Sequence, residues 1–86
     1  MNISRDEQRV LHALALGGRI HVERAANGRL THATCLTREG HGLACCTLAL
    51  FRKLRAKRLV ESRGGAPYRI SQLGRRHVAA RADNRG

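Results

Sequence analysis

The sequence predicts a single α+β domain that spans residues 1–86, and three observations support this prediction. Hydrophobic residues recur at helical spacing near the start of the chain, in residues 47–58 and after residue 70. Between these segments they alternate with polar residues, as in strands, and turn-forming residues separate the strands. With 86 residues, of which 42% are hydrophobic, the chain can bury one modest core and no second one.

The first predicted helix begins after Ser4. Ser4 is followed three residues later by Glu7, which is the spacing of a capping box. The glycine pair at residues 17–18 is expected to end the helix. The apolar residues that recur at helical spacing here are Ile3, Val10, Leu11 and Leu14.

Residues 19–36 are predicted to form a β-hairpin. Ile20 and Val22 alternate with polar residues, and Asn27-Gly28 is a strong signal for a hairpin turn. Residues 30–35 are the expected returning strand.

Residues 37–46 have no clear period, so we expect a short or irregular linker. Thr37 could cap a short helical turn, but Gly40 and Gly42 weaken any helix in which they lie.

The second predicted helix covers residues 47–58, with Thr47 as its N-cap, and it is strongly basic. Leu50, Phe51 and Leu54 fall on one face, which is expected to pack into the core. Five basic residues lie in the seven positions 52–58, with no acidic residue among them.

A second hairpin follows, with strands near residues 59–62 and 68–70 and a glycine-rich basic turn at residues 63–67. Ser71 is expected to cap a last helix that continues to Ala82, and residues 83–86 are expected to fray. A basic helix followed by a hairpin is the order of a winged helix-turn-helix. We therefore expect a winged helix-turn-helix-like fold, with an extra hairpin after the first helix and a C-terminal helix after the wing. The residues predicted to share one core are Leu11, Leu14, Leu50, Phe51, Leu54 and Ile70.

The charge of the chain predicts an anionic partner. Seventeen basic residues against six acidic ones give a formal net charge of +11. Residues 1–40 hold six basic and four acidic side chains (net +2), whereas residues 41–86 hold eleven and two (net +9). Such an excess favours binding to duplex DNA or to an acidic protein surface. The expected binding residues are Arg52, Lys53, Arg55 and Lys57 on the basic helix and Arg63 and Arg69 on the second hairpin. The alternative is that these side chains form only a solvated surface.

The sequence carries no pattern typical of an enzyme or of a metal site. Cys35, His41 and Cys45 lack the paired spacing of zinc ligands, and no catalytic triad or phosphate-binding Gly-Lys-Ser/Thr motif is present. We therefore expect a non-enzymatic protein with no cofactor and no metal. Three cysteines, two of them adjacent, favour reduced thiols in the cytoplasm. No signal peptide or membrane segment is predicted.

Several short motifs occur in a defined order along the whole chain. They are Asn2-Ile3-Ser4-Arg5 with Glu7-Gln8, Leu11-His12, Arg38-Glu39-Gly40, Cys46-Thr47-Leu48-Ala49, Phe51-Arg52-Lys53-Leu54, Pro67-Tyr68-Arg69-Ile70 and Asp83-Asn84-Arg85. From Met1 to about Arg85 the chain thus resembles the YjhX-type toxins, which are described as inhibitors of bacterial DNA topoisomerase I and are paired with an acetyltransferase-like antitoxin. Residues 41–44 depart from the family because they are richer in glycine and alanine than its apolar run, which puts a helix before the basic helix in doubt.

Three functions are compatible with these observations. The resemblance implies a toxin-like inhibitor of DNA topoisomerase I that acts by binding the enzyme, its DNA or both. The helix and hairpin order instead favours a winged-helix transcriptional regulator. The charge alone would also fit a basic adaptor for an acidic protein. No heptad seam lies outside the core, so a monomer or a weak dimer is expected.

Overall fold

The computed structural model describes the backbone of residues 2–83 and the side chains of residues 2–78. Within this part of the chain it contains three helices and two antiparallel sheets. The elements in order are α1 (Arg5–Ala15), β1 (Arg19–Arg24), β2 (Leu30–Leu36), β3 (Gly42–Leu43), α2 (Leu48–Ala56), β4 (Val60–Glu61), β5 (Arg69–Ile70) and α3 (Gln72–Asp83). The predicted α+β class and the predicted order of elements are therefore confirmed.

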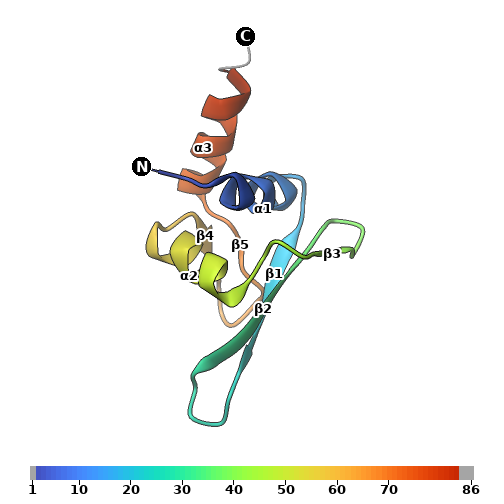
Figure 1. The fold of residues 1–86 in the computed structure, drawn as a ribbon, viewed down its shortest axis with the longest axis vertical. Helices are drawn as coiled ribbons and strands as arrows, with labels where there is room; N and C mark the ends of the chain where they lie inside the picture. The colour runs from blue at the N-terminus through green and yellow to red at the C-terminus, as the bar shows by residue number, and fades with distance from the viewer. Residues whose placement is uncertain (1, 84–86) are drawn as a thin grey trace.

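The helix α1 begins with the predicted capping box. The Ser4 hydroxyl accepts a hydrogen bond from the Glu7 N–H at 3.1 Å, and the Glu7 carboxylate accepts one from the Ser4 N–H at 3.0 Å. The helix ends where Gly17 takes a φ of 108° and the Gly18 N–H donates to the Ala13 carbonyl at 3.0 Å. In Figure 1, α1 lies across the molecule between α3 and the remaining elements.

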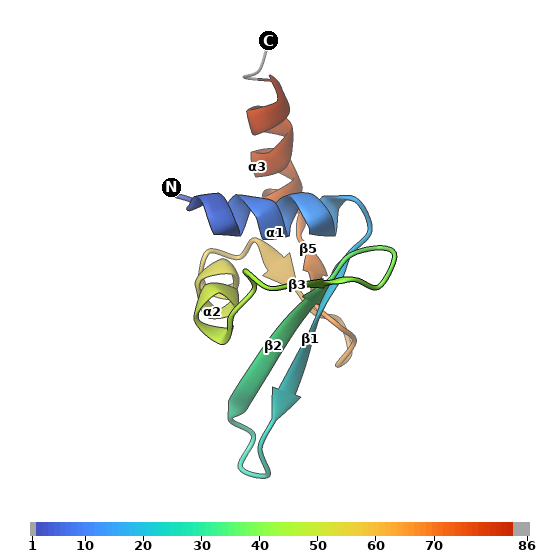
Figure 2. The same cartoon turned by 45° about the vertical axis from the view of Figure 1, so that its right-hand side comes forward.

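The first hairpin, β1 and β2, projects away from the helices as an arm (Figure 2). Ile20 pairs with Cys35 at its base and Arg24 pairs with Leu30 near its tip, with a bulge between Glu23 and Arg24. Residues 23–29, at the tip, are all exposed. Only the base of the arm therefore contributes to the core.

The linker between the arm and α2 contains no helix in the structure. Residues 37–40 form a turn, and β3 then pairs with β2 through Cys35 and Leu43. A helix-turn-helix would need a helix directly before α2, and the described chain has a short strand and a turn there. The architecture that the structure establishes is therefore the three helices and two sheets.

The helix α2 is held by its caps. The Thr47 hydroxyl accepts a hydrogen bond from the Leu50 N–H at 3.1 Å, as the sequence predicts. The helix ends at Ala56, two residues before the predicted end, because Arg58 takes a left-handed φ of 61° and the Leu59 N–H bonds back to the Leu54 carbonyl.

The second hairpin, β4 and β5, follows α2 and is joined to the first. Its strands are shorter than predicted, and they pair through Val60 with Ile70. Ile20 and Tyr68 exchange two backbone hydrogen bonds of 2.8 Å each, which connects β1 to the second hairpin. Ser71 then caps α3, since its hydroxyl accepts a hydrogen bond from the Gly74 N–H at 3.1 Å. The fraying predicted for residues 83–86 lies, beyond Asp83, outside the described residues.

The core lies between α1, α2, the base of the arm and the second hairpin. All six residues that the sequence assigns to it are buried. Burial of such aliphatic and aromatic surface is the main stabilising contribution in a domain of this size. The buried hydrophobic residues are Val10, Leu11, Leu14, Ile20, Leu30, Cys35, Cys46, Leu50, Phe51, Leu54, Leu59, Val60 and Ile70.

Candidate functional site

The helix α2 presents a cationic face to solvent. Arg52, Lys53 and Arg55 are exposed, whereas Leu50, Phe51 and Leu54 on the opposite face are buried. No acidic residue occurs in α2. Within the described part of the chain, these three cations form no ion pair with any carboxylate. Their charges are therefore left to a partner or to solvent.

Aromatic contacts beneath this face fix its position. The Phe51 ring meets the Tyr68 ring edge-on, with 4.8 Å between the ring centroids and an interplanar angle of 78°. The guanidinium carbon of Arg55 lies 5.7 Å from the Phe51 ring centroid, which is within the range of a cation–π interaction. The basic face is thus attached to the second hairpin through packed rings.

Lys57 differs from the other predicted binding residues because it is already paired. Its ammonium lies 2.8 Å from one Glu7 carboxylate oxygen and 3.1 Å from the other, and it donates to the Asn2 carbonyl at 2.6 Å. Burial disfavours the charged form of Glu7, but hydrogen bonds from Lys57 and Ser4 outweigh it and hold the pKa of this carboxyl below its ordinary value. The Glu7 side chain is only 4% exposed and that of Lys57 25%. Lys57 therefore joins α2 to α1.

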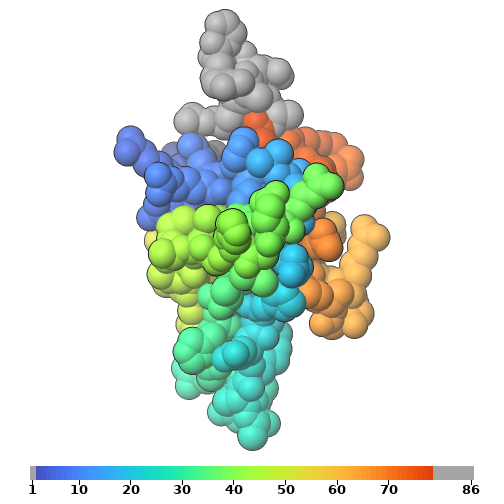
Figure 3. Space-filling view, turned by 90° about the vertical axis from the view of Figure 1, so that its right-hand side faces the viewer, coloured from blue at the N-terminus to red at the C-terminus, as the bar shows by residue number. Residues whose placement is uncertain are grey.

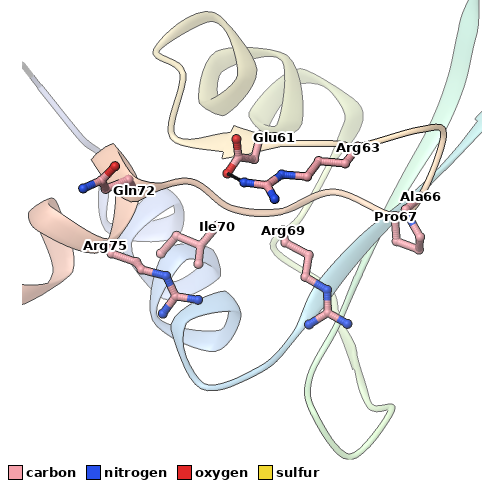
Figure 4. Close-up of a pocket in the computed structure, with 8 residues that line it drawn as sticks. All are labelled: Glu61, Arg63, Ala66, Pro67, Arg69, Ile70, Gln72 and Arg75. Atoms are coloured by element: carbon pink, nitrogen blue, oxygen red, sulfur yellow. Dashed lines mark ion pairs between the residues drawn. The ribbon is translucent and has the colours of Figure 1, made fainter.

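A second cationic site is a cleft of about 530 Å³ between the second hairpin and the start of α3 (Figure 4). Arg69 and Arg75 extend on the same side of β5, and Arg63 extends toward Glu61. The closest atoms of Arg63 and Glu61 are 4.0 Å apart. The residues that line the cleft are Glu61, Arg63, Ala66, Pro67, Arg69, Ile70, Gln72 and Arg75.

The structure thus divides the six predicted binding residues into separate groups. Arg52, Lys53 and Arg55 share the face of α2, whereas Arg63 and Arg69 line the cleft. Figure 3 shows the tip of the second hairpin, in light orange, on the opposite side of that view from the yellow-green start of α2. Sequence reasoning missed Arg75. Its place one turn after the predicted cap Ser71, beside the end of the second hairpin, was the available signal.

The cysteines are free thiols. Cys35 and Cys46 are buried, and a hydrogen bond with Cys46, together with burial, raises the pKa of the Cys35 thiol well above its ordinary value. No group of three or more His, Cys, Asp or Glu side chains in the described residues is placed to hold a metal ion. None of the helices, as far as the described residues extend, is long and apolar enough to cross a membrane.

Comparison with known proteins places this small basic α+β chain among bacterial toxins. Residues 1–85 match the YjhX toxin family, described as "Putative toxin of bacterial toxin-antitoxin pair". The chain belongs to this family, so the predicted resemblance is confirmed.

Several curated relatives share nearly the full length of the chain. A UPF0386 protein of Ruegeria sp. strain TM1040 is 65% identical over 85 residues, covering 99% of this chain and 100% of the relative. Those of Beijerinckia indica and Aliivibrio fischeri are 61% and 52% identical, again over 99% of this chain and 100% of the relative. No solved structure matches the chain.

Proposed function

We propose that the protein is the toxin of a toxin–antitoxin pair and that it inhibits DNA topoisomerase I by binding the enzyme, its DNA or both through the basic face of α2. The observation that carries this proposal is the exposed row Arg52, Lys53 and Arg55, held on a buried face and unpaired within the described chain. Family membership supports the toxin role. The topoisomerase target and an acetyltransferase-like antitoxin come from the family resemblance.

The chemistry of the row suits a polyanion. Guanidinium groups make paired hydrogen bonds to phosphate and carboxylate, and Arg52 and Arg55 lie three positions apart on one helix face. Ala49 and Ala56 are also exposed on α2, and their small side chains permit close approach to a backbone or groove. In this proposal Arg63 and Arg69 of the second hairpin add contacts outside the helix, and no catalytic step is needed.

A relaxation assay with purified DNA topoisomerase I tests the proposal. The variant Arg52→Ala/Lys53→Ala/Arg55→Ala should lose inhibition by about a hundredfold or more, because each lost cation removes a charge-assisted hydrogen bond of about 1.5–3 kcal/mol. The fold should persist, since the three side chains make no core contact and alanine is a good helix former.

A matched control separates this face from net charge. The variant Arg5→Ala/Arg9→Ala/Arg29→Ala also removes three exposed cations, and it should inhibit as the parent does. Full inhibition by the α2 variant, or equal losses in the two variants, would contradict the proposed site. A thermal melt of each variant checks that the fold is retained.

DNA binding is measured separately by fluorescence anisotropy on a duplex. If about five phosphates are neutralised, log affinity should fall with log salt concentration with a slope of about −4.5. Absence of binding in dilute buffer, together with retained inhibition, would place the contact on the enzyme alone.

A winged-helix transcriptional regulator is the second candidate. It is favoured by the hairpin that directly follows α2 and by its connection to β1 through Ile20 and Tyr68. Such a regulator would prefer one operator sequence over random duplex by about a thousandfold or more, and it would leave topoisomerase I uninhibited. Anisotropy with fragments of its own promoter against random duplex distinguishes the two candidates.

A further inference from the structure

We propose that the cleft between the second hairpin and α3 is a binding site for a phosphomonoester, the dianionic phosphate that ends a nucleotide or a nucleic-acid strand. This inference goes beyond the proposed function, which rests on α2. Three arginines and a single carboxylate line the cleft. The arginines come from three positions far enough apart in sequence that only the fold brings them together.

Charge complementarity favours a dianion. Arg63, Arg69 and Arg75 contribute three positive charges and Glu61 one negative charge, which leaves the cleft at +2. A phosphomonoester carries about −1.5 to −2 at neutral pH, whereas an internal phosphodiester carries a single charge. The cleft therefore matches a terminal phosphate better than one internal linkage.

The positions of the side chains fit such a group. Arg69 and Arg75 extend on the same side of β5, so their guanidinium groups can approach one anion from two directions (Figure 4). The first turn of α3, which begins at Gln72, contributes backbone N–H groups and the positive end of the helix dipole. Glu61 lies 4.0 Å from Arg63, so this contact is loose enough for a phosphate to displace it.

The cleft also has room and surface for the rest of a nucleotide. Its volume of about 530 Å³ is that of a small-molecule site and far exceeds what a phosphate needs. Ala66, Pro67 and Ile70 supply apolar lining beside the arginines. A phosphate attached to a sugar or a base would therefore use more of the cleft than inorganic phosphate.

The test compares ligands that differ only in the terminal phosphate. Anisotropy is measured with a short single-stranded oligonucleotide bearing a 5′-phosphate or a 5′-hydroxyl, and calorimetry with AMP or adenosine. The phosphorylated ligand should bind about tenfold more tightly or better, as expected for charge-assisted hydrogen bonds. A preference confined to the oligonucleotide identifies a strand end, and one shared by AMP identifies a nucleotide. Equal affinity with and without the phosphate in both pairs would overturn the proposal.

Three variants locate the site. Arg75→Ala should abolish the phosphate preference, while Arg76→Ala, an exposed cation on the same helix that does not line the cleft, should retain it. Glu61→Gln should tighten binding of the phosphorylated ligand because the cleft loses its only negative charge. A phosphate preference that survives in Arg75→Ala, or is lost equally in Arg76→Ala, would overturn the assignment. The α2 variant keeps the cleft intact, so its loss of topoisomerase inhibition is read independently.

Discussion

The two helices that enclose the core, α1 and α2, use the same backbone motifs at their ends but place different side chains in them. Each begins with a hydroxyl cap, Ser4 or Thr47. Each ends with a left-handed residue followed by a backbone hydrogen bond to the last turn. That left-handed residue is Gly17 after α1 and Arg58 after α2.

The side chains show that the two helices meet different demands. Asp6 and Glu7 place negative charge in the first turn of α1, where the helix dipole favours it, and glycine adopts the left-handed turn without strain. The first turn of α2 has no acidic residue, and arginine occupies the strained turn. Local preferences thus favour α1, whereas α2 depends on packing and on the Lys57–Glu7 pair. A helix that keeps cations at a cost in stability is a good candidate for binding.

The largest expected effect on stability concerns the end of α1. A methyl group on Gly18 would lie 2.6 Å from the Leu36 carbonyl oxygen and 2.9 Å from that of Ala13, and neither backbone atom can move freely. We expect Gly18→Ala to lower the free energy of unfolding by about 3 kcal/mol, as overpacking does. Urea denaturation measures this change. Gly42→Ala, whose new methyl group would meet open space, is the control and should change stability little.

A smaller effect is expected at the contact between the helices. Glu7→Gln keeps the shape of the capping box but removes the charge that holds Lys57, so the free energy of unfolding should fall by about 2 kcal/mol. Because folding lowers the pKa of Glu7, its stabilisation is complete above the ordinary value of 4.5 and is lost as pH falls through the folded pKa. The variant should therefore lose less stability than the parent on acidification.

Asp6→Asn is the control for that comparison. Asp6 lies in the same first turn but is exposed and makes no contact with Lys57. Urea melts at neutral pH and near pH 3 should show the large change only for Glu7→Gln. Equal losses in the two variants would mean that the helix dipole, and not the Lys57 pair, is the source of the stabilisation.

The smallest expected effect has the opposite sign. Arg58→Gly should raise the free energy of unfolding by about 0.5–1 kcal/mol, because glycine adopts a left-handed φ without the penalty that arginine incurs. The reciprocal change Gly17→Ala should lower it by a similar amount. A destabilised Arg58→Gly protein would show that the two helix ends do not differ in the way described above.

The elements that local patterns govern could be predicted from the sequence. Ser4 with Glu7, Thr47, and the turn at Asn27-Gly28 determine where helices and hairpins begin, because their hydrogen bonds reach only a few residues along the chain. The buried face of α2 also follows from the spacing of Leu50, Phe51 and Leu54.

What could not be predicted depends on tertiary contacts. Lys57 was expected to bind a partner because the pattern of α2 cannot reveal a carboxylate fifty positions away. The cleft was likewise missed as a unit, since Arg63, Arg69 and Arg75 meet only when α3 packs beside the second hairpin. The left-handed turn at Arg58 has no sequence signal, because arginine is not the residue that such turns favour.

The bridge between Ile20 and Tyr68 has a consequence for synthesis of the chain. It closes a loop of nearly fifty residues, so the edge of β1 gains these two hydrogen bonds only after Tyr68 has left the ribosome. A product that ends before Tyr68 would lack β5 and α3 and would expose an unpaired strand edge that invites aggregation. Premature termination therefore yields a chain without the closed fold, and native structure becomes possible only when synthesis is nearly complete.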